Sequence, residues 1–199
     1  MIIDTLRANT SNMTSKTELL RKLQGVVAQR GSDGATLQHL AAATRLSRAT
    51  LYHHFPGGKE EIIAQLVRLA ISDLQKHAFS HLIKQPAAKV TPAKQLRRFV
   101  QGFAAYAKQQ NYTCLLATLT FHDAAHDHLA AHQAIIHQQM QDWEKSLVEV
   151  FIEYGHGTKK AKRQARGLLS DLYGTLASSK LMDRVEDCPK LFARLERKF

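Results

Sequence analysis

Two short helical patterns separated by only three residues constrain the fold of this chain more than any other feature of its sequence. Thr36 and Ser47 precede the two patterns, where their hydroxyl groups can accept hydrogen bonds from the free amides of a first helical turn. In the second pattern Leu51 and Phe55 lie one turn apart on one face. Pro56 ends this pattern, because the residue before a proline avoids helical geometry. We therefore predict two short helices joined by a tight turn.

The rest of the chain also shows helical spacing of its apolar residues, and only four prolines interrupt it. Ser15 and Glu18 form a capping box that predicts a helix start, and we expect this helix to stop at Gly31. Residues 1–13 lack the periodicity and are expected to form an arm. Further helices are predicted from about Lys59 to Lys84, from Pro92 onwards, at 112–122, at 126–154, at 159–182 and from Pro189 to near Phe199.

These elements predict an all-α fold of about nine helices, with a three-helix head at residues 14–58 and a larger helical domain at residues 59–199. The predicted helix at 126–154 carries a core-facing seam with a seven-residue repeat. Its members are Leu129, Ile136, Trp143 and Val150, interleaved with Met140, Leu147 and Tyr154.

The chain of 199 residues carries a formal net charge of +11. This balance suits a polyanionic partner, with an affinity that falls as salt rises. The excess is not concentrated in the head, since residues 1–60 hold eight Lys and Arg against four Asp and Glu. No stretch of about 18 uncharged apolar residues exists, and the first residues do not resemble a secretory signal. We expect no membrane partner and a cytoplasmic, nucleoid-associated protein.

The helix at 37–44, the turn at 45–47 and the helix at 48–54 have the proportions of a helix-turn-helix, whose second helix enters the major groove of DNA. The angle between the helices is expected to be fixed by buried Leu40, Leu46, Leu51 and Phe55. The exposed side keeps hydrogen-bond donors that suit phosphates and base edges, namely Ser47, Arg48, Thr50, Tyr52, His53 and His54.

Residues 15–65 resemble the tetracycline-repressor (TetR) family of bacterial regulators. The resemblance is carried by Thr36 and Ser47 at the starts of two helices, by Leu51-Tyr52 and Phe55 within the second, and by Lys59-Glu60 after it. The variant Leu-Tyr-His-His-Phe-Pro-x-Gly-Lys resembles a subgroup that includes regulators of multidrug-resistance genes.

Carried over by position, the resemblance implies DNA contacts for particular residues. Phosphate contacts are implied for Thr36, Ser47, Tyr52, His54 and Lys59, while Arg48, Thr50 and His53 are implied to lie nearest the bases. A lysine at a helix start also extends the anion site formed by the free amides there. The family often has glycine where Arg45 stands, and an arginine with positive φ would cost about 1 kcal/mol. Either the turn is altered or Arg45 is retained as a phosphate contact, and we favour the second.

The resemblance also implies an effector pocket in the larger domain, enclosed by the helices that start near residues 92, 112, 126 and 159. We expect a small apolar or aromatic effector whose binding spreads two reading heads and weakens operator affinity. The candidate lining residues are Phe99, Phe103, Tyr106, Leu119, His122, Trp143, Leu147 and Tyr173. Most aromatic residues at helical spacing are core residues, so core packing is the competing interpretation.

The predicted helix at 159–182 has two faces. One is apolar, with Ala165, Leu168, Leu169, Leu172 and Leu176, and the other carries mostly small residues, with Gly167, Asp171, Gly174 and Ser178. Two helical glycines seven residues apart suggest close approach by another backbone. We expect this helix and the one at 189–198 to form the interface of a homodimer that binds a palindromic, double-stranded operator.

An alternative rests on five histidines within His122–His137. His122 and His126, like His128 and His132, lie one helical turn apart, which is a geometry for zinc, nickel or copper in a metal-binding helical protein or enzyme. A second alternative keeps the DNA-binding head and gives the larger domain a protein partner. We favour a ligand-responsive repressor without catalytic residues, cofactor or metal, because the sequence has no HExxH, catalytic-triad signature or phosphate-binding glycine loop.

Overall fold

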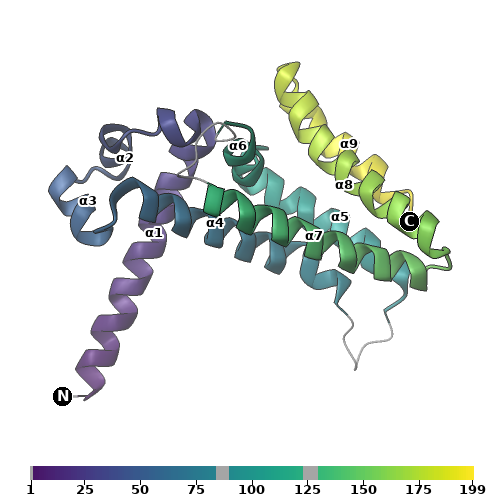
Figure 1. The fold of residues 1–199 in the computed structure, drawn as a ribbon, viewed down its shortest axis with the longest axis horizontal. Helices are drawn as coiled ribbons and strands as arrows, with labels where there is room; N and C mark the ends of the chain where they lie inside the picture. The colour runs from purple at the N-terminus through teal and green to yellow at the C-terminus, as the bar shows by residue number, and fades with distance from the viewer. Residues whose placement is uncertain (1, 84–89, 123–129) are drawn as a thin grey trace. The chain divides into compact units, whose positions relative to one another are not determined.

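A computed structural model describes residues 2–83, 90–122 and 130–199, with side chains for 16–83, 90–121 and 132–199. Every regular element in these ranges is helical, which confirms the all-α prediction (Figure 1). The α-helices are α1 (Ile2–Gly34), α2 (Leu37–Thr44), α3 (Arg48–His54), α4 (Gly58–His77), α5 (Pro92–Gln109), α6 (Leu115–His122), α7 (Ala130–Glu153), α8 (Thr158–Leu181) and α9 (Cys188–Glu196). Two 3-10 helices are η1 (Phe79–Leu82) and η3 (Val185–Asp187).

The chain forms two compact units. The first comprises residues 1–70 and 115–133, and the second comprises residues 71–114 and 134–199, so that α4 and α7 each contribute to both. The sequence-based division between residues 58 and 59 stays a prediction. None of the helices in the described ranges is both long and apolar enough to cross a bilayer.

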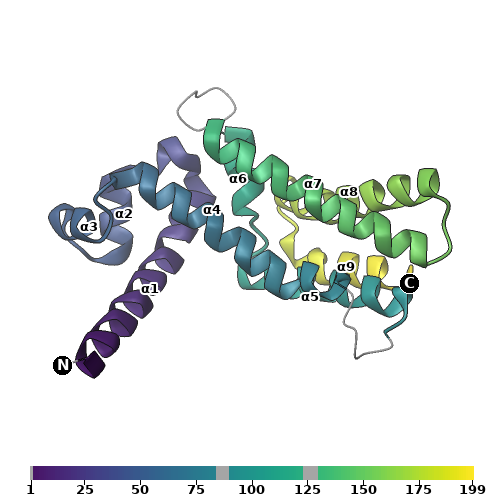
Figure 2. The same cartoon turned by 60° about the horizontal axis from the view of Figure 1, so that its bottom comes forward.

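In the first unit α1, α2 and α3 pack around a small core, and α6 lies against α1. Figures 1 and 2 both show α2 and α3 side by side. The hydroxyl of Thr118 on α6 donates to the carbonyl oxygen of Ala28 on α1 at 3.3 Å. The fully buried side chains of this core include Leu23, Val27, Leu40, Leu51 and Phe55, whereas Leu46, which was also expected to be buried, is half-buried.

The sequence-based start of α1 is wrong. The helix begins at Ile2 and includes residues 2–13, which were expected to form an arm before the helix, and Ser15 lies inside the helix. A segment without apolar periodicity offers no apolar face for packing, but it can still be helical. Once a helix has begun, each added residue gains one backbone hydrogen bond, so the helix can extend into such a segment. The expected stop at Gly31 is a break, with φ 69° and ψ 179°, after which one more helical turn follows.

The end of α4 was also predicted wrongly. The helix ends at His77 and not near Lys84, which lies outside the described residues, and η1 follows. In η1 the ring of Phe79 stacks on Trp143 of α7 with 4.1 Å between centroids and lies 4.9 Å from Phe99 of α5. Phe79 is buried there between two rings that lie far from it in the sequence, so the local pattern did not indicate its position.

The second unit buries most of the predicted seam of α7. Ile136, Trp143, Leu147 and Val150 are buried, whereas Tyr154 is 40% exposed and does not face the core as predicted. Leu129 lies outside the described residues. Helices α8 and α9 lie side by side, and α9 also packs on α5 (Figures 1 and 2).

The two faces predicted for α8 are both present. The apolar face is buried, while Gly167, Asp171 and Gly174 are exposed and Ser178 is half-buried. A Cβ atom added at Gly167 or Gly174 would meet nothing within 4 Å. Within the described residues, no other backbone approaches the two glycines.

Candidate nucleic-acid interface

The start of α2 is fixed by hydrogen bonds around Thr36. Its hydroxyl caps the helix by accepting the backbone N–H of His39 at 3.3 Å, as the sequence predicts. The Nδ1 atom of His39 lies 2.9 Å from the carbonyl oxygen of Gly34 and 3.1 Å from the Thr36 hydroxyl. Thr36 is exposed, so its hydroxyl combines a capping role with access from solvent.

The turn between α2 and α3 keeps the left-handed conformation for which glycine is favoured. Arg45 has φ 57° and ψ 28° and ends α2. Its N–H donates to Ala42, and the N–H of Leu46 donates to the carbonyl oxygen of Ala41 at 3.1 Å. These bonds satisfy carbonyl groups at the helix end. The turn is therefore not altered by the arginine. Arg45, whose side chain is exposed, adopts the left-handed conformation at a cost of about 1 kcal/mol.

Helix α3 is capped by Ser47, whose hydroxyl accepts the backbone N–H of Thr50 at 3.0 Å, as predicted. The two hydroxyl oxygens of Ser47 and Thr50 also lie 2.8 Å apart in a hydrogen bond. Thr50, which the family resemblance places nearest the bases, therefore has a local partner as well as partial exposure.

The two sides of α3 differ sharply in exposure. Leu51 and Phe55 are 1% and 0% exposed, and they anchor the helix in the first unit. On the other side Arg48, Tyr52 and His53 are exposed, and Thr50 and His54 are half-buried. The predicted reading side therefore projects from a packed core toward solvent.

The turn after α3 is held from two directions. Gly58 has φ +63°, and a Cβ atom there would lie 3.2 Å from the ring of Tyr52. The carboxylate of Glu61 accepts the backbone N–H of Gly57 at 2.9 Å and lies 3.2 Å from the ammonium of Lys16 on α1. These contacts fix the direction in which the chain leaves α3, which we call the reading helix.

Lys59 is placed differently from a free phosphate contact. Its ammonium donates to the carbonyl oxygen of Ser32 at 3.2 Å, and the side chain is half-buried. An ammonium has three donor hydrogens, so this bond leaves two for a phosphate. Lys59 thus ties the start of α4 to the end of α1 while keeping its charge beside the reading helix.

All nine predicted DNA-binding residues lie in one segment, Thr36 to Lys59, of the first unit. Sequence reasoning missed Lys16 and Glu61, whose contacts position this segment. The available signal was an acidic residue just after the Gly57-Gly58 turn, where a carboxylate can accept free amides at a helix start. As a chemical surface, the segment offers guanidinium, imidazole and hydroxyl donors that match phosphates and base edges.

The predicted effector-pocket residues whose side chains the structure describes are buried, except for Tyr173, which is half-buried with its ring packed against the core. Phe99 and Trp143 flank Phe79, and the rings of Phe103 and Tyr173 meet edge to face at 5.4 Å. Burial raises the pKa of the Tyr173 phenol well above its ordinary value. Tyr106 and Leu147 are also buried in the second unit, and Leu119 is buried in the first. The side chain of His122 lies outside the described residues, and the pocket stays a prediction.

The histidine cluster falls largely outside the described part of the chain. His126 and His128 are not described, and neither is the side chain of His122. His132 is half-buried and His137 is exposed. Among the described side chains no three His, Cys, Asp or Glu are grouped so as to hold a metal ion. The metal-site alternative stays untested.

Comparison with known sequences finds one family model that is similar to the segment from Thr36 to Lys59 and its surroundings. Residues 25–66 match the sequence model of the bacterial regulatory proteins of the tetR family. No curated protein matches the chain in sequence.

Comparison with solved structures extends over most of the chain. A TetR-family transcriptional regulator from Agrobacterium tumefaciens matches with a TM-score of 0.73 and 15% identity, over 94% of this chain and 98% of that chain. A transcriptional regulator from Rhodococcus sp. Rha1 matches with a TM-score of 0.69 and 22% identity, over 92% of each chain. AibR, solved with isovaleryl coenzyme A and operator DNA, matches with a TM-score of 0.58 and 19% identity, over 80% of this chain and 85% of that chain. These structures share the fold, and the family match supports a DNA-binding transcriptional regulator.

Proposed function

We propose that this chain is a TetR-type transcriptional regulator that represses its target genes and leaves its operator when an effector binds. The observation that carries the proposal is the exposed side of α3, where Arg48, Tyr52 and His53 face solvent while Leu51 and Phe55 anchor the helix. A short helix held in this way can enter a major groove without rearrangement of the head. Repression of chromosomal genes would place the protein in the cytoplasm.

We propose further that the protein acts as a homodimer on a palindromic operator. One α3 helix covers only a few base pairs, and two-fold pairing supplies the affinity and spacing that an operator requires. The exposed stripe of Gly167, Asp171, Gly174 and Ser178 on α8 supports α8 and α9 as the interface, because open space at the two glycines can admit the backbone of a second copy.

Effector control is the third part of the proposal. The solved structure of AibR with isovaleryl coenzyme A and operator DNA shows that a protein of this fold has been captured with both a small molecule and DNA. In this chain the aromatic cluster around Trp143 is the proposed site. An effector can shift operator binding only by its differential affinity for the bound and released forms.

Titration of fluorescently labelled duplex DNA from the chain's own upstream region tests the DNA-binding part. We expect saturable binding whose logarithmic affinity falls linearly with the logarithm of salt concentration. Arg48→Ala is expected to weaken binding, whereas Lys162→Ala, which removes an exposed positive charge on α8, serves as a matched control. Equal loss from both substitutions would indicate that net charge, and not α3, supplies the affinity.

A further inference from the structure

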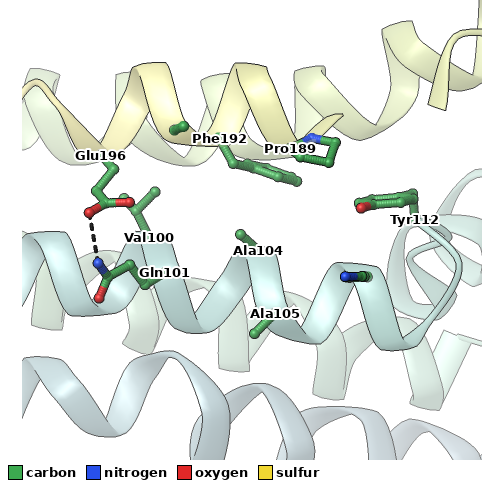
Figure 3. Close-up of a pocket in the computed structure, with 10 residues that line it drawn as sticks. Val100, Gln101, Ala104, Ala105, Tyr112, Pro189, Phe192 and Glu196 are labelled. Atoms are coloured by element: carbon green, nitrogen blue, oxygen red, sulfur yellow. Dashed lines mark hydrogen bonds between the residues drawn. The ribbon is translucent and has the colours of Figure 1, made fainter. Parts of the chain in front are cut away.

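A groove of about 290 Å³ runs between α5 and α9 in the second unit (Figure 3). Its walls are apolar along the middle, with Val100 and Ala104 on α5 and Phe192 on α9. The ring of Phe192 is buried and meets Phe103 edge to face at 5.9 Å, so this wall is held in place by the core. The volume is near the lower limit of about 300 Å³ for small-molecule sites.

The two ends of the groove differ in charge. At one end Gln101 donates its amide N–H to the carboxylate of Glu196 at 2.7 Å, and Figure 3 shows this pair bridging α5 and α9. Lys108 lies one helical turn beyond Ala104, toward the end where Tyr112 stands. Among the described residues Lys108 has no ion-pair partner, and its side chain is exposed.

The backbone conformation of residues 111 and 112 determines where the Tyr112 side chain lies. Asn111 and Tyr112 have φ values of 50° and 56°, a left-handed conformation that is unfavourable for residues with a Cβ atom. The N–H of Tyr112 donates to the carbonyl oxygen of Ala107 at 2.7 Å, which closes α5 and directs the phenol to the groove. Lys180 donates to the hydroxyl of the next residue, Thr113, which ties this turn to α8.

We propose that this groove binds a small monocarboxylate with an apolar body. The carboxylate would lie at the end with Lys108 and the Tyr112 hydroxyl, and the apolar body would lie along Val100, Ala104 and Phe192. The carboxylate of Glu196 at the opposite end disfavours the reversed orientation, because like charges repel. This site is separate from the aromatic cluster around Trp143, and binding to it does not depend on the proposed regulatory function.

The test uses the full chain without DNA, with alanine methyl groups labelled with ¹³C. Octanoate and its neutral analogue octanamide are titrated, and the methyl signals of Ala104 and Ala193, which both line the groove, are followed by NMR. We expect saturable shifts of these two methyl groups with octanoate, and binding of octanamide that is at least fivefold weaker. Lys108→Gln is expected to weaken octanoate about fivefold, which is less than a buried charge-assisted hydrogen bond would give because solvent screens the exposed ammonium.

Two variants keep the result interpretable. Lys94→Gln removes an exposed charge in the first turn of α5, outside the groove, and is expected to leave octanoate affinity unchanged. Ala104→Phe fills the groove and is expected to abolish the shift at Ala193. Absence of saturable shifts, equal affinity for octanoate and octanamide, or equal losses from Lys94→Gln and Lys108→Gln would each overturn the proposal. A failure here would leave the DNA-binding proposal untouched, because the head is in the other unit.

Discussion

The carboxylate of Glu61 accepts the backbone N–H of Gly57 at a distance of 2.9 Å, across the turn that follows the reading helix. The same carboxylate lies 3.2 Å from the ammonium of Lys16, which itself stands 4.8 Å from the centroid of the Phe55 ring. One side chain thus connects α1, the end of α3 and the start of α4. Since α3 has only seven residues, its direction depends on contacts of this kind at its ends.

Replacement of Glu61 by alanine is expected to lower the free energy of unfolding by about 1–2 kcal/mol, as measured by urea denaturation, because the amide of Gly57 loses its acceptor. We expect DNA affinity to fall without a change in its salt dependence, since a carboxylate at Glu61 would repel a phosphate and is not among the proposed phosphate contacts. Glu60→Ala, which changes the exposed neighbour, is the control. A reduced salt slope in Glu61→Ala would contradict a purely positioning role.

The free energy of unfolding is expected to depend on pH through Glu61. The hydrogen bond from Gly57 and the ammonium of Lys16 lower the pKa of Glu61 below its ordinary value of 4.5. A carboxyl with a lowered folded-state pKa stabilises the fold above its unfolded-state pKa and loses this effect as pH falls through the folded-state pKa. The difference in unfolding free energy between the wild-type chain and Glu61→Gln should therefore shrink below about pH 4.5. A constant difference down to pH 2 would contradict this.

Arg45 allows conformational and electrostatic effects to be separated. Arg45→Gly is expected to raise the free energy of unfolding by about 1 kcal/mol, because glycine adopts φ 57° without strain. Arg45→Ala keeps the strain and removes the charge. If Arg45 contacts a phosphate, both variants should bind DNA more weakly, with a salt slope reduced by about one unit. Wild-type affinity in both variants would remove Arg45 from the interface.

Two helical glycines, Gly102 in the second unit and Gly25 in the first, are expected to respond differently to substitution. A Cβ atom at Gly102 would lie 1.8 Å from the carbonyl oxygen of His77, so Gly102→Ala should lower the free energy of unfolding by at least about 1–3 kcal/mol. Gly25→Ala on α1 meets nothing within 4 Å and should not destabilise the chain. Thermal unfolding followed by circular dichroism distinguishes the two. Similar melting temperatures would show that α4 and α5 do not approach so closely.

The proposed dimer is tested by the stripe on α8. Gly174→Gln is compatible with the isolated chain, because the added side chain would point into open space, but it would block a second backbone. We expect sedimentation velocity to show a wild-type dimer at micromolar protein and a Gly174→Gln variant shifted toward monomer. Lys162→Gln on the same helix is the control. A wild-type monomer, or a Gly174→Gln dimer of unchanged stability, would exclude this interface.

The helix-turn-helix was predictable because its signals are local. Thr36 and Ser47 cap their helices as expected, and Leu51 and Phe55 lie buried one turn apart. A capping hydroxyl accepts a hydrogen bond from a backbone N–H that is only three residues away. Both groups therefore lie in the same short stretch of sequence, and the bond can be predicted from it.

Features that depend on distant residues were not predictable. The amphipathic pattern continues past His77, yet α4 ends there and Phe79 takes its place between Phe99 and Trp143. Nothing near Phe79 in the sequence indicates those partners. The tie between Lys16 and Glu61 joins residues 45 positions apart and was missed for the same reason. At Arg45 the family resemblance identified the strained position, but only the backbone angle showed that the turn is unaltered, and the phosphate contact of Arg45 stays a prediction.

We propose that the exposed side of α3 reads the sequence of duplex DNA. The most direct measurement compares the affinity of the wild-type chain, Arg48→Ala and Lys59→Ala for a duplex that the wild-type chain selects from a random library and for a scrambled duplex. We predict that Lys59→Ala weakens both duplexes by the same factor, whereas Arg48→Ala loses about 1–3 kcal/mol on the selected duplex and little on the scrambled one. Equal losses on both duplexes for Arg48→Ala, or no sequence preference in the wild-type chain, would contradict the claim.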